Sequence, residues 1–135
     1  MIERGFLDVK TFRDIVSSRA GKQKLVTIDP SNTIAEAVEL MKKFNIENIP
    51  VMNGNGLEGS ISESGLFNKM LSGLDIKHTK VADVIEPAYP VVDYETPVER
   101  LSTLINKENG AVLAKDEAGD FHIVTKYDVI QALRN

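Results

Sequence analysis

The chain has 135 residues, of which 42% are hydrophobic and 27% are charged, a balance typical of folded globular proteins rather than disordered ones. Its net charge is −4 and its lysines and arginines are scattered, which argues against nucleic acid as a partner. Cysteine is absent, so disulfides, thiolate zinc sites and cysteine nucleophiles are excluded. No apolar run approaches the roughly 18 residues of a membrane span and no signal-peptide core opens the chain, so we expect a cytoplasmic protein without membrane contact.

Four segments follow one another along the chain. Residues 1–23 contain TFRDIVSSR, which predicts one or two helical turns that connect to or pack against the remainder. Residues 24–73 and 89–135 repeat one order of elements at an offset of about 63, the spacing between Ser62 and Thr125. The linker between them, 74–88, contains VADVIEP, which predicts a second short helix.

Each repeat predicts the order β-α-β-β-α, which places the chain in the α+β class. The first repeat has an extended piece at 26–28, a helix from residue 34, strands at 49–52 and 57–62, and a helix at 66–71. The second repeat has the corresponding elements at 90–92, from residue 98, at 111–115, at 121–125 and at 129–133.

Two patterns that resemble known sites have simpler explanations. Gly54, Gly56 and Gly59 spell the G-x-G-x-x-G of dinucleotide-binding folds, but LEGSIS after Gly56 alternates like a strand, which favours a hairpin turn. His78 and His122 lack the spacing of metal ligands, and no nucleophile–base pair or phosphate-binding loop is visible. We therefore expect neither a metal site nor an enzyme.

The stretch FHIVTKYDVIQAL combines a strand with an amphipathic helix, and Thr125 and Asp128 stand at their junction. Thr-x-x-Asp before an apolar run is a helix capping pattern. The same two side chains at a positive helix end could also bind the two hydroxyls of a ribose. Spacing alone leaves both interpretations open.

The ordered pair of repeats, carried by FNIENIPVMNGNGLEGSIS and FHIVTKYDVIQAL, resembles a tandem pair of CBS domains, a Bateman module, over about residues 24–134. MIERGFLD and the segments around LVTIDPSNTIAEAVELMKKFNIENIPV and KVADVIEPAYPVVDYETPVERLSTLI are similar to the C-terminal regulatory region of cystathionine β-synthase. This resemblance implies two repeats packed sheet to sheet with pseudo-two-fold symmetry. It also implies an upstream catalytic domain that holds pyridoxal phosphate, with no cofactor in the present chain.

The resemblance further implies two clefts between the repeats, each able to bind an adenosine derivative such as S-adenosylmethionine, AMP, ADP or ATP. The first cleft would comprise Ile46, Asn48, Ile49, Ile123, Thr125, Tyr127 and Asp128. The second would comprise Ser62, Gly65, Asn109, Gly110 and Ala111. Because Gly65 stands where the family has its ribose-binding carboxylate, we expect the second cleft to be weak or empty. His122 replaces a usual glycine and bears on how closely a ligand approaches the first.

Two functions are consistent with this resemblance. The first is a regulatory module that binds an adenosyl ligand, associates as a homodimer and controls an attached lyase domain allosterically. The second is an interaction module without a ligand, whose task is dimerisation or inhibition by contact. Gly65 and His122 favour the second function, and the Thr125-x-x-Asp128 pattern favours the first.

Overall fold

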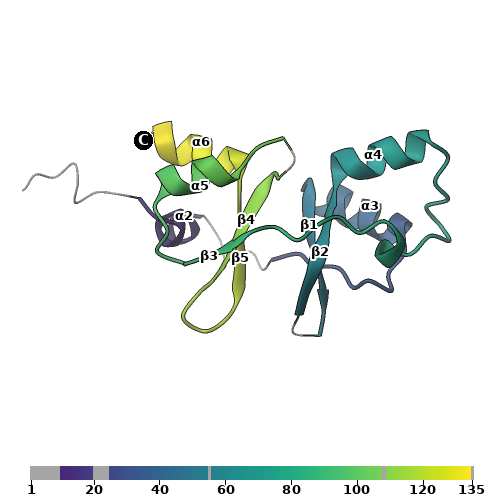
Figure 1. The fold of residues 1–135 in the computed structure, drawn as a ribbon, viewed down its shortest axis with the longest axis horizontal. Coiled ribbons are helices and arrows are strands. Elements are labelled where there is room, and N and C mark those ends of the chain that lie inside the picture. The colour runs from purple at the N-terminus through teal and green to yellow at the C-terminus, as the bar shows by residue number, and fades with distance from the viewer. Residues whose placement is uncertain (1–9, 20–24, 55, 108, 135) are drawn as a thin grey trace, which may run out of the picture. The chain divides into compact units, whose positions relative to one another are not determined.

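The computed structural model describes residues 10–19, 25–54, 56–107 and 109–134 (Figure 1). The segment MIERGFLD, which carried part of the resemblance to cystathionine β-synthase, lies outside the described residues. The chain divides into two compact units: unit 1 comprises Met1–Leu25 with Pro90–Asn135, and unit 2 comprises Val26–Tyr89.

Unit 2 is an antiparallel hairpin covered by two helices. Its elements are α3 (Ile34–Phe44), β1 (Asn48–Asn53), β2 (Gly56–Ser62), α4 (Glu63–Leu71) and the 3-10 turn η1 (Val81–Asp83). Helix α3 begins at a capping box in which Thr33 and Glu36 bond each other's backbone N–H groups. It ends at Asn45, which adopts the left-handed conformation (φ 53°). The predicted strand at 26–28 is reduced to a parallel bridge between Ile28 and Val51.

Unit 1 contains a three-stranded sheet, β3 (Val91–Val92), β4 (Ala111–Lys115) and β5 (Phe121–Thr125). Strand β3 is parallel to β4, and β4 is antiparallel to β5. Three helices accompany the sheet: α2 (Phe12–Ser18), α5 (Val98–Leu104) and α6 (Lys126–Arg134). Helix α2 joins unit 1 although it lies before the repeats in the sequence, and its first turn bonds the 94–96 segment through backbone N–H groups of Phe12 and Arg13.

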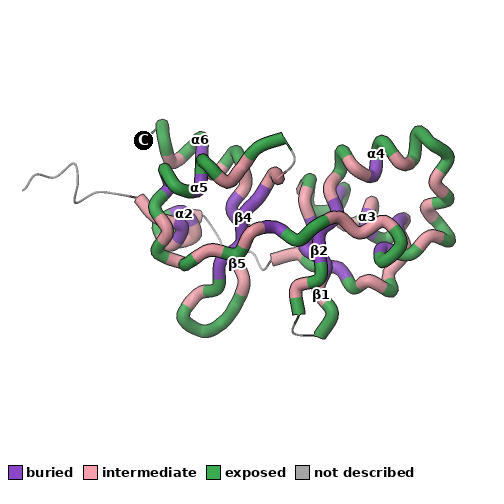
Figure 2. Tube along the Cα trace, in the orientation of Figure 1, coloured by how far each residue is buried: buried purple, intermediate pink, exposed green. Residues whose placement is uncertain are grey.

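The hydrophobic core of each unit lies between its strands and its helices (Figure 2). In unit 2, Ile34 of α3, Ile49 of β1, Ile61 of β2 and Leu66 of α4 are buried together. The core of unit 1 comprises Phe12, Ile15, Val98, Leu101, Val112, Ala114, Val124 and Val129. Burial of these apolar side chains is the main favourable contribution to folding.

The predicted order β-α-β-β-α is confirmed in full in unit 1, and in unit 2 it is confirmed from α3 onward, with the bridge at Ile28 in place of the first strand. The strand registers show that the two repeats are equivalent. Asn48 pairs with Ser62 in unit 2, and Ala111 pairs with Thr125 in unit 1. Both members of these pairs differ by 63 residues between the units (111 − 48 and 125 − 62). The glycine-rich pattern is a hairpin as predicted, because Gly54 adopts φ +63° and Gly56 already begins β2.

Candidate functional site

In unit 1, the junction of β5 and α6 brings the Thr125-x-x-Asp128 pattern into one hydrogen-bonded group. The backbone N–H of Thr125 donates to Oδ2 of Asp128 at 2.9 Å, and the Thr125 hydroxyl donates to the same oxygen at 3.2 Å. The capping role is therefore present. Among the described residues, every hydrogen bond to this carboxylate ends on Oδ2, so Oδ1 remains able to accept further donors.

Arg19, which follows helix α2, also reaches this carboxylate. Its Nη2 lies 3.0 Å from Oδ2 of Asp128 and donates to the backbone carbonyl of Ile123 as well. The two side chains of the ion pair are 33% and 30% exposed, so the pair is accessible to solvent and to a ligand. No local pattern in the sequence indicates Arg19, because it lies 109 residues from Asp128.

His122 does not share the strand face of the candidate residues. Successive residues of a strand point to opposite faces, so His122 and the buried Val124 share one face of β5, and Ile123 and Thr125 share the other. The His122 ring lies 5.8 Å from the ring of Tyr94, and its Nε2 lies 2.8 Å from Oδ2 of Asp116. Its side chain therefore leaves the Ile123 and Thr125 face unobstructed.

The contact between His122 and Asp116 predicts an acid-dependent contribution to stability. The hydrogen bond from His122, followed by one from the Asp120 backbone, lowers the pKa of Asp116 below its ordinary value of 3.8. A lowered pKa gives stability that is complete above the unfolded value and is lost as the pH falls through the folded value. We expect Asp116→Asn to lose less unfolding free energy than the wild type between about pH 5 and about pH 2 in urea titrations. Equal acid slopes for the two proteins would contradict this assignment.

In unit 2, the corresponding junction of β2 and α4 contains a carboxylate that comes from the linker. The N–H of Gly65 donates to Oγ of Ser62 at 3.1 Å, as in a helix cap. The N–H of Ser62 lies 3.2 Å from Oε2 of Glu86, and the Ser62 hydroxyl lies 2.9 Å from Oε1 and 3.1 Å from Oε2. No local pattern in the sequence indicates Glu86, because it lies 24 residues from Ser62 and not at the third position after it.

The remaining predicted residues of unit 2 lie at the start of β1 or just before it, opposite the end of β2. Asn48 is opposite Ser62, and its Oδ1 accepts from the hydroxyl of the buried Tyr89 at 3.0 Å. Ile49 is fully buried in the core of unit 2, whereas Ile46 is partly buried against that core. The predicted pairing of these residues with those of unit 1 stays a prediction.

The equivalent residues of unit 1 are placed in the same way. Ala111 is buried opposite Thr125, and Gly110 is partly exposed immediately before it. The side-chain amide of Asn109 donates to the carbonyl of Leu104 at 2.7 Å and so holds the loop that leads into β4. Tyr127, in the first turn of α6, is 67% exposed.

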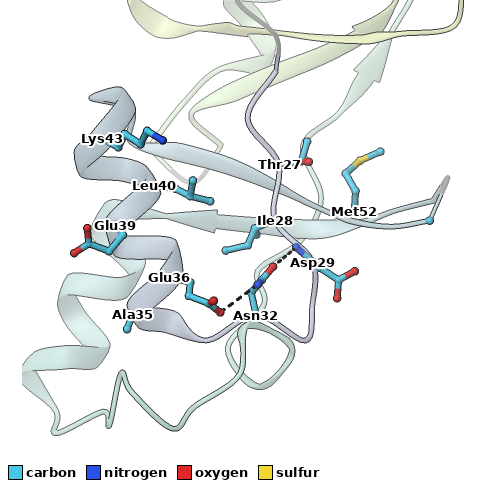
Figure 3. Close-up of a pocket in the computed structure, with 11 residues that line it drawn as sticks. Thr27, Ile28, Asp29, Asn32, Ala35, Glu36, Glu39, Leu40, Lys43 and Met52 are labelled. Carbon is cyan, nitrogen blue, oxygen red and sulfur yellow. Dashed lines mark hydrogen bonds between the residues drawn. The ribbon is translucent and has the colours of Figure 1, made fainter.

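A groove of about 660 Å³ lies elsewhere on unit 2, between α3 and the 27–29 segment (Figure 3). Its charged lining is mostly acidic, with Asp29, Glu36 and Glu39 against a single ammonium group, that of Lys43. Hydrogen bonds lower the pKa of Asp29, chiefly from Ser31, and of Glu36, chiefly from the Thr33 backbone, so both remain ionised. This charge disfavours a phosphate, and none of the predicted ligand-binding residues lines the groove.

Within the part of the chain that the structure describes, no group of three or more His, Asp or Glu side chains is arranged to bind a metal ion. None of the described helices combines the length and the apolar character needed to cross a bilayer.

Comparison with known proteins identifies the fold. Residues 12–72 match the family model of the CBS domain. A CBS-domain structure, NE2398, is 20% identical with a TM-score of 0.82, and the match covers 94% of this chain and 99% of that one. A putative signal-transduction protein with CBS domains from Burkholderia ambifaria is 16% identical with a TM-score of 0.83, covering 92% of this chain and 93% of that one.

A third similar structure, CBSX2 in complex with AMP, is 25% identical with a TM-score of 0.68, and the match covers 92% of this chain and 96% of that one. No curated protein matches the sequence significantly. The chain thus has the paired fold of CBS-domain proteins, and residues 12–72 are similar to the CBS domain in sequence. None of these matches names cystathionine β-synthase.

Proposed function

We propose that the chain is a regulatory module that binds an adenosine derivative bearing a phosphate, with the carboxylate of Asp128 as the acceptor for the ribose hydroxyls. The observation that carries the proposal is the geometry of this carboxylate. Its Oδ2 is held by Thr125 and Arg19, and its Oδ1 has no donor among the described residues. The AMP complex of CBSX2, a protein of the same fold, supports this class of ligand.

The carboxylate is suited to a vicinal diol. Ionised carboxylates accept hydrogen bonds that are shorter and stronger than those between neutral groups. The Thr125 bonds and the Arg19 ion pair hold Asp128 in one position before a ligand arrives, which reduces the ordering cost of binding. We propose that Ile46 and Ile123 contact the base, while Ile49, being fully buried, contributes its backbone.

Arg19 favours a phosphate over a sulfonium group. A ligand held by Asp128 would lie close to the guanidinium group, which binds phosphate oxygens in a planar, charge-assisted manner. The cationic sulfonium of S-adenosylmethionine would instead be repelled. We therefore place AMP, ADP or ATP before S-adenosylmethionine as the ligand.

The regulatory output requires an attached or associated partner. A ligand can shift a conformational equilibrium only by the difference between its affinities for the two states. A lyase catalytic domain of the cystathionine β-synthase type, as the sequence resemblance suggested, is one such partner in the proposal. A second copy of the chain is another.

Exposed apolar side chains support the homodimer. Helix α4 exposes Phe67, Met70 and Leu71 at helical spacing, and α6 exposes Tyr127, Ile130 and Leu133. A dimer that covers these helices would remove this apolar area from water. The ligand-free interaction module remains the competing function, because these surfaces do not depend on either carboxylate.

Calorimetric titration with AMP, the 2′,3′-dideoxy analogue of AMP and S-adenosylmethionine tests the proposal. We expect saturable AMP binding and an affinity at least about tenfold lower for the dideoxy analogue, since it lacks both hydroxyl donors. AMP at about 100 times its dissociation constant should also stabilise the fold by about 2.7 kcal/mol in thermal denaturation. Equal affinities for AMP and its analogue would overturn the ribose role of Asp128, and no heat with any compound would leave the interaction module as the function.

A further inference from the structure

We propose that Glu86 supplies the ribose-binding carboxylate that the sequence of the first repeat lacks at Gly65. The inference rests on the proposed function, because it assigns to unit 2 the ligand chemistry proposed for Asp128. It reverses the expectation that the cleft containing Ser62 is weak or empty for want of an acceptor. The sequence pattern places Gly65 three residues after Ser62, whereas the acceptor comes from 24 residues away.

The hydrogen bonds of the two carboxylates are equivalent. In unit 1, the N–H and the hydroxyl of Thr125 lie 2.9 and 3.2 Å from Oδ2 of Asp128. In unit 2, the N–H and the hydroxyl of Ser62 lie 3.2 and 3.1 Å from Oε2 of Glu86. Ser62 and Thr125 occupy equivalent strand positions, so the two carboxylates stand at equivalent places in the two repeats.

Gly65 is the residue that gives Glu86 this position. A Cβ atom on Gly65 would lie 2.3 Å from Oε2 of Glu86 and 2.9 Å from Oγ of Ser62. An aspartate at residue 65 and the observed carboxylate of Glu86 would therefore compete for the same space. Glycine and the linker glutamate form a matched pair, and the glycine does not by itself indicate a lost site.

The backbone holds Glu86 in place. Its N–H donates to the carbonyl of Ser60, and its carbonyl accepts from the N–H of Ser60, both at 2.9 Å. The Ser60 hydroxyl also donates to the carbonyl of Pro87 at 2.7 Å. Gly59 permits this approach, because a Cβ there would lie 2.5 Å from the Glu86 carbonyl oxygen. The linker thus runs beside β2 as a short antiparallel partner, and the carboxylate is positioned before a ligand binds.

The carboxylate retains capacity to accept further donors. The Ser62 hydroxyl has one proton and can donate to only one of the two Glu86 oxygens at a time. An ionised carboxylate has about four acceptor positions, so at least two remain for a vicinal diol. Among the described residues, Glu86 has no ion pair, whereas Asp128 pairs with Arg19. The first half-site, around Asp128, and the second half-site, around Glu86, therefore differ in charge.

Titration of AMP into Asp128→Asn protein isolates the second half-site. In this background we expect saturable binding that Glu86→Gln weakens by about tenfold or more, because the charged acceptor is replaced by a neutral amide. The amide oxygen of glutamine can still accept from the Ser62 N–H, and thermal denaturation checks that the fold is retained. As a control, Glu63→Gln removes an exposed carboxylate at the start of helix α4 and should leave the AMP affinity unchanged.

A carboxylate exchange provides the reciprocal test. Glu86→Ala combined with Gly65→Asp moves the acceptor to the position that it has in Thr125-x-x-Asp128, and we expect it to restore AMP binding lost in Glu86→Ala alone. The inference is overturned if Glu86→Gln leaves AMP affinity unchanged, or if Asp128→Asn alone abolishes all binding while the wild type binds one AMP. In both cases the proposed function of Asp128 stands. Failure of the wild type to bind AMP would overturn both proposals.

Discussion

Replacing Asp128 with asparagine is expected to weaken AMP binding at the first half-site by about tenfold or more, roughly 1.4 kcal/mol. The substitution removes the charged acceptor for the ribose hydroxyls and the counterion of Arg19 together. It also removes part of a helix cap, for which a stability loss of about 1 kcal/mol is typical. Calorimetry measures the first effect and urea denaturation the second.

The chain offers a matched control for the cap. Asp14 accepts from the N–H of Thr11 at 2.9 Å and from the Thr11 hydroxyl at 3.1 Å, through the same oxygen that Asp128 uses. Asp14→Asn should therefore cost a similar stability and leave AMP affinity unchanged. If the two substitutions reduce stability alike and neither changes binding, Asp128 is only a cap and the ribose assignment is wrong.

Phe12→Ala is expected to destabilise the chain by about 3–5 kcal/mol. Phe12 is 0% exposed and packs within the core of unit 1, with its ring 5.9 Å from that of Tyr94. Deleting the ring removes its transfer free energy and leaves a cavity that the surrounding sheet and helices fill only in part. The loss would be a large fraction of the 5–15 kcal/mol that typically stabilises a small protein.

Ser17→Ala provides the control, because Ser17 is exposed on the same helix and alanine favours helices. It should change the unfolding free energy by less than about 0.5 kcal/mol. A small loss for Phe12→Ala would instead mean that α2 is a connector lying on the surface of unit 1. The comparison thus decides whether this helix is part of the unit that contains Asp128.

The hydrogen bonds around Asp128 link helix α2 to the proposed ligand. Arg19 follows α2 directly, and its guanidinium bonds both Asp128 and the carbonyl of Ile123. A phosphate that engages Arg19 would change the bonds at the end of α2. Ligand binding at this half-site would therefore act on the segment that precedes the first repeat.

The sequence by itself determined the order of the elements. Apolar residues at helical spacing indicated α3 and α5, alternation and glycine turns indicated the hairpins, and Thr-x-x-Asp indicated the start of α6. The offset of 63 residues between repeats agrees with the strand registers of both units. These features depend on residues close together in the chain, so local spacing is sufficient to predict them.

The tertiary structure decided which side chains meet at each strand end. Arg19 reaches Asp128 across 109 residues, and Glu86 reaches Ser62 across 24 residues, because the backbone brings α2 beside β5 and the linker beside β2. No periodicity records such contacts, since each depends on the packing of a whole unit. For the same reason, the sequence pattern indicated that the expected ribose-binding carboxylate is missing at position 65. Only the fold showed that the carboxylate of Glu86 occupies the space beside Gly65.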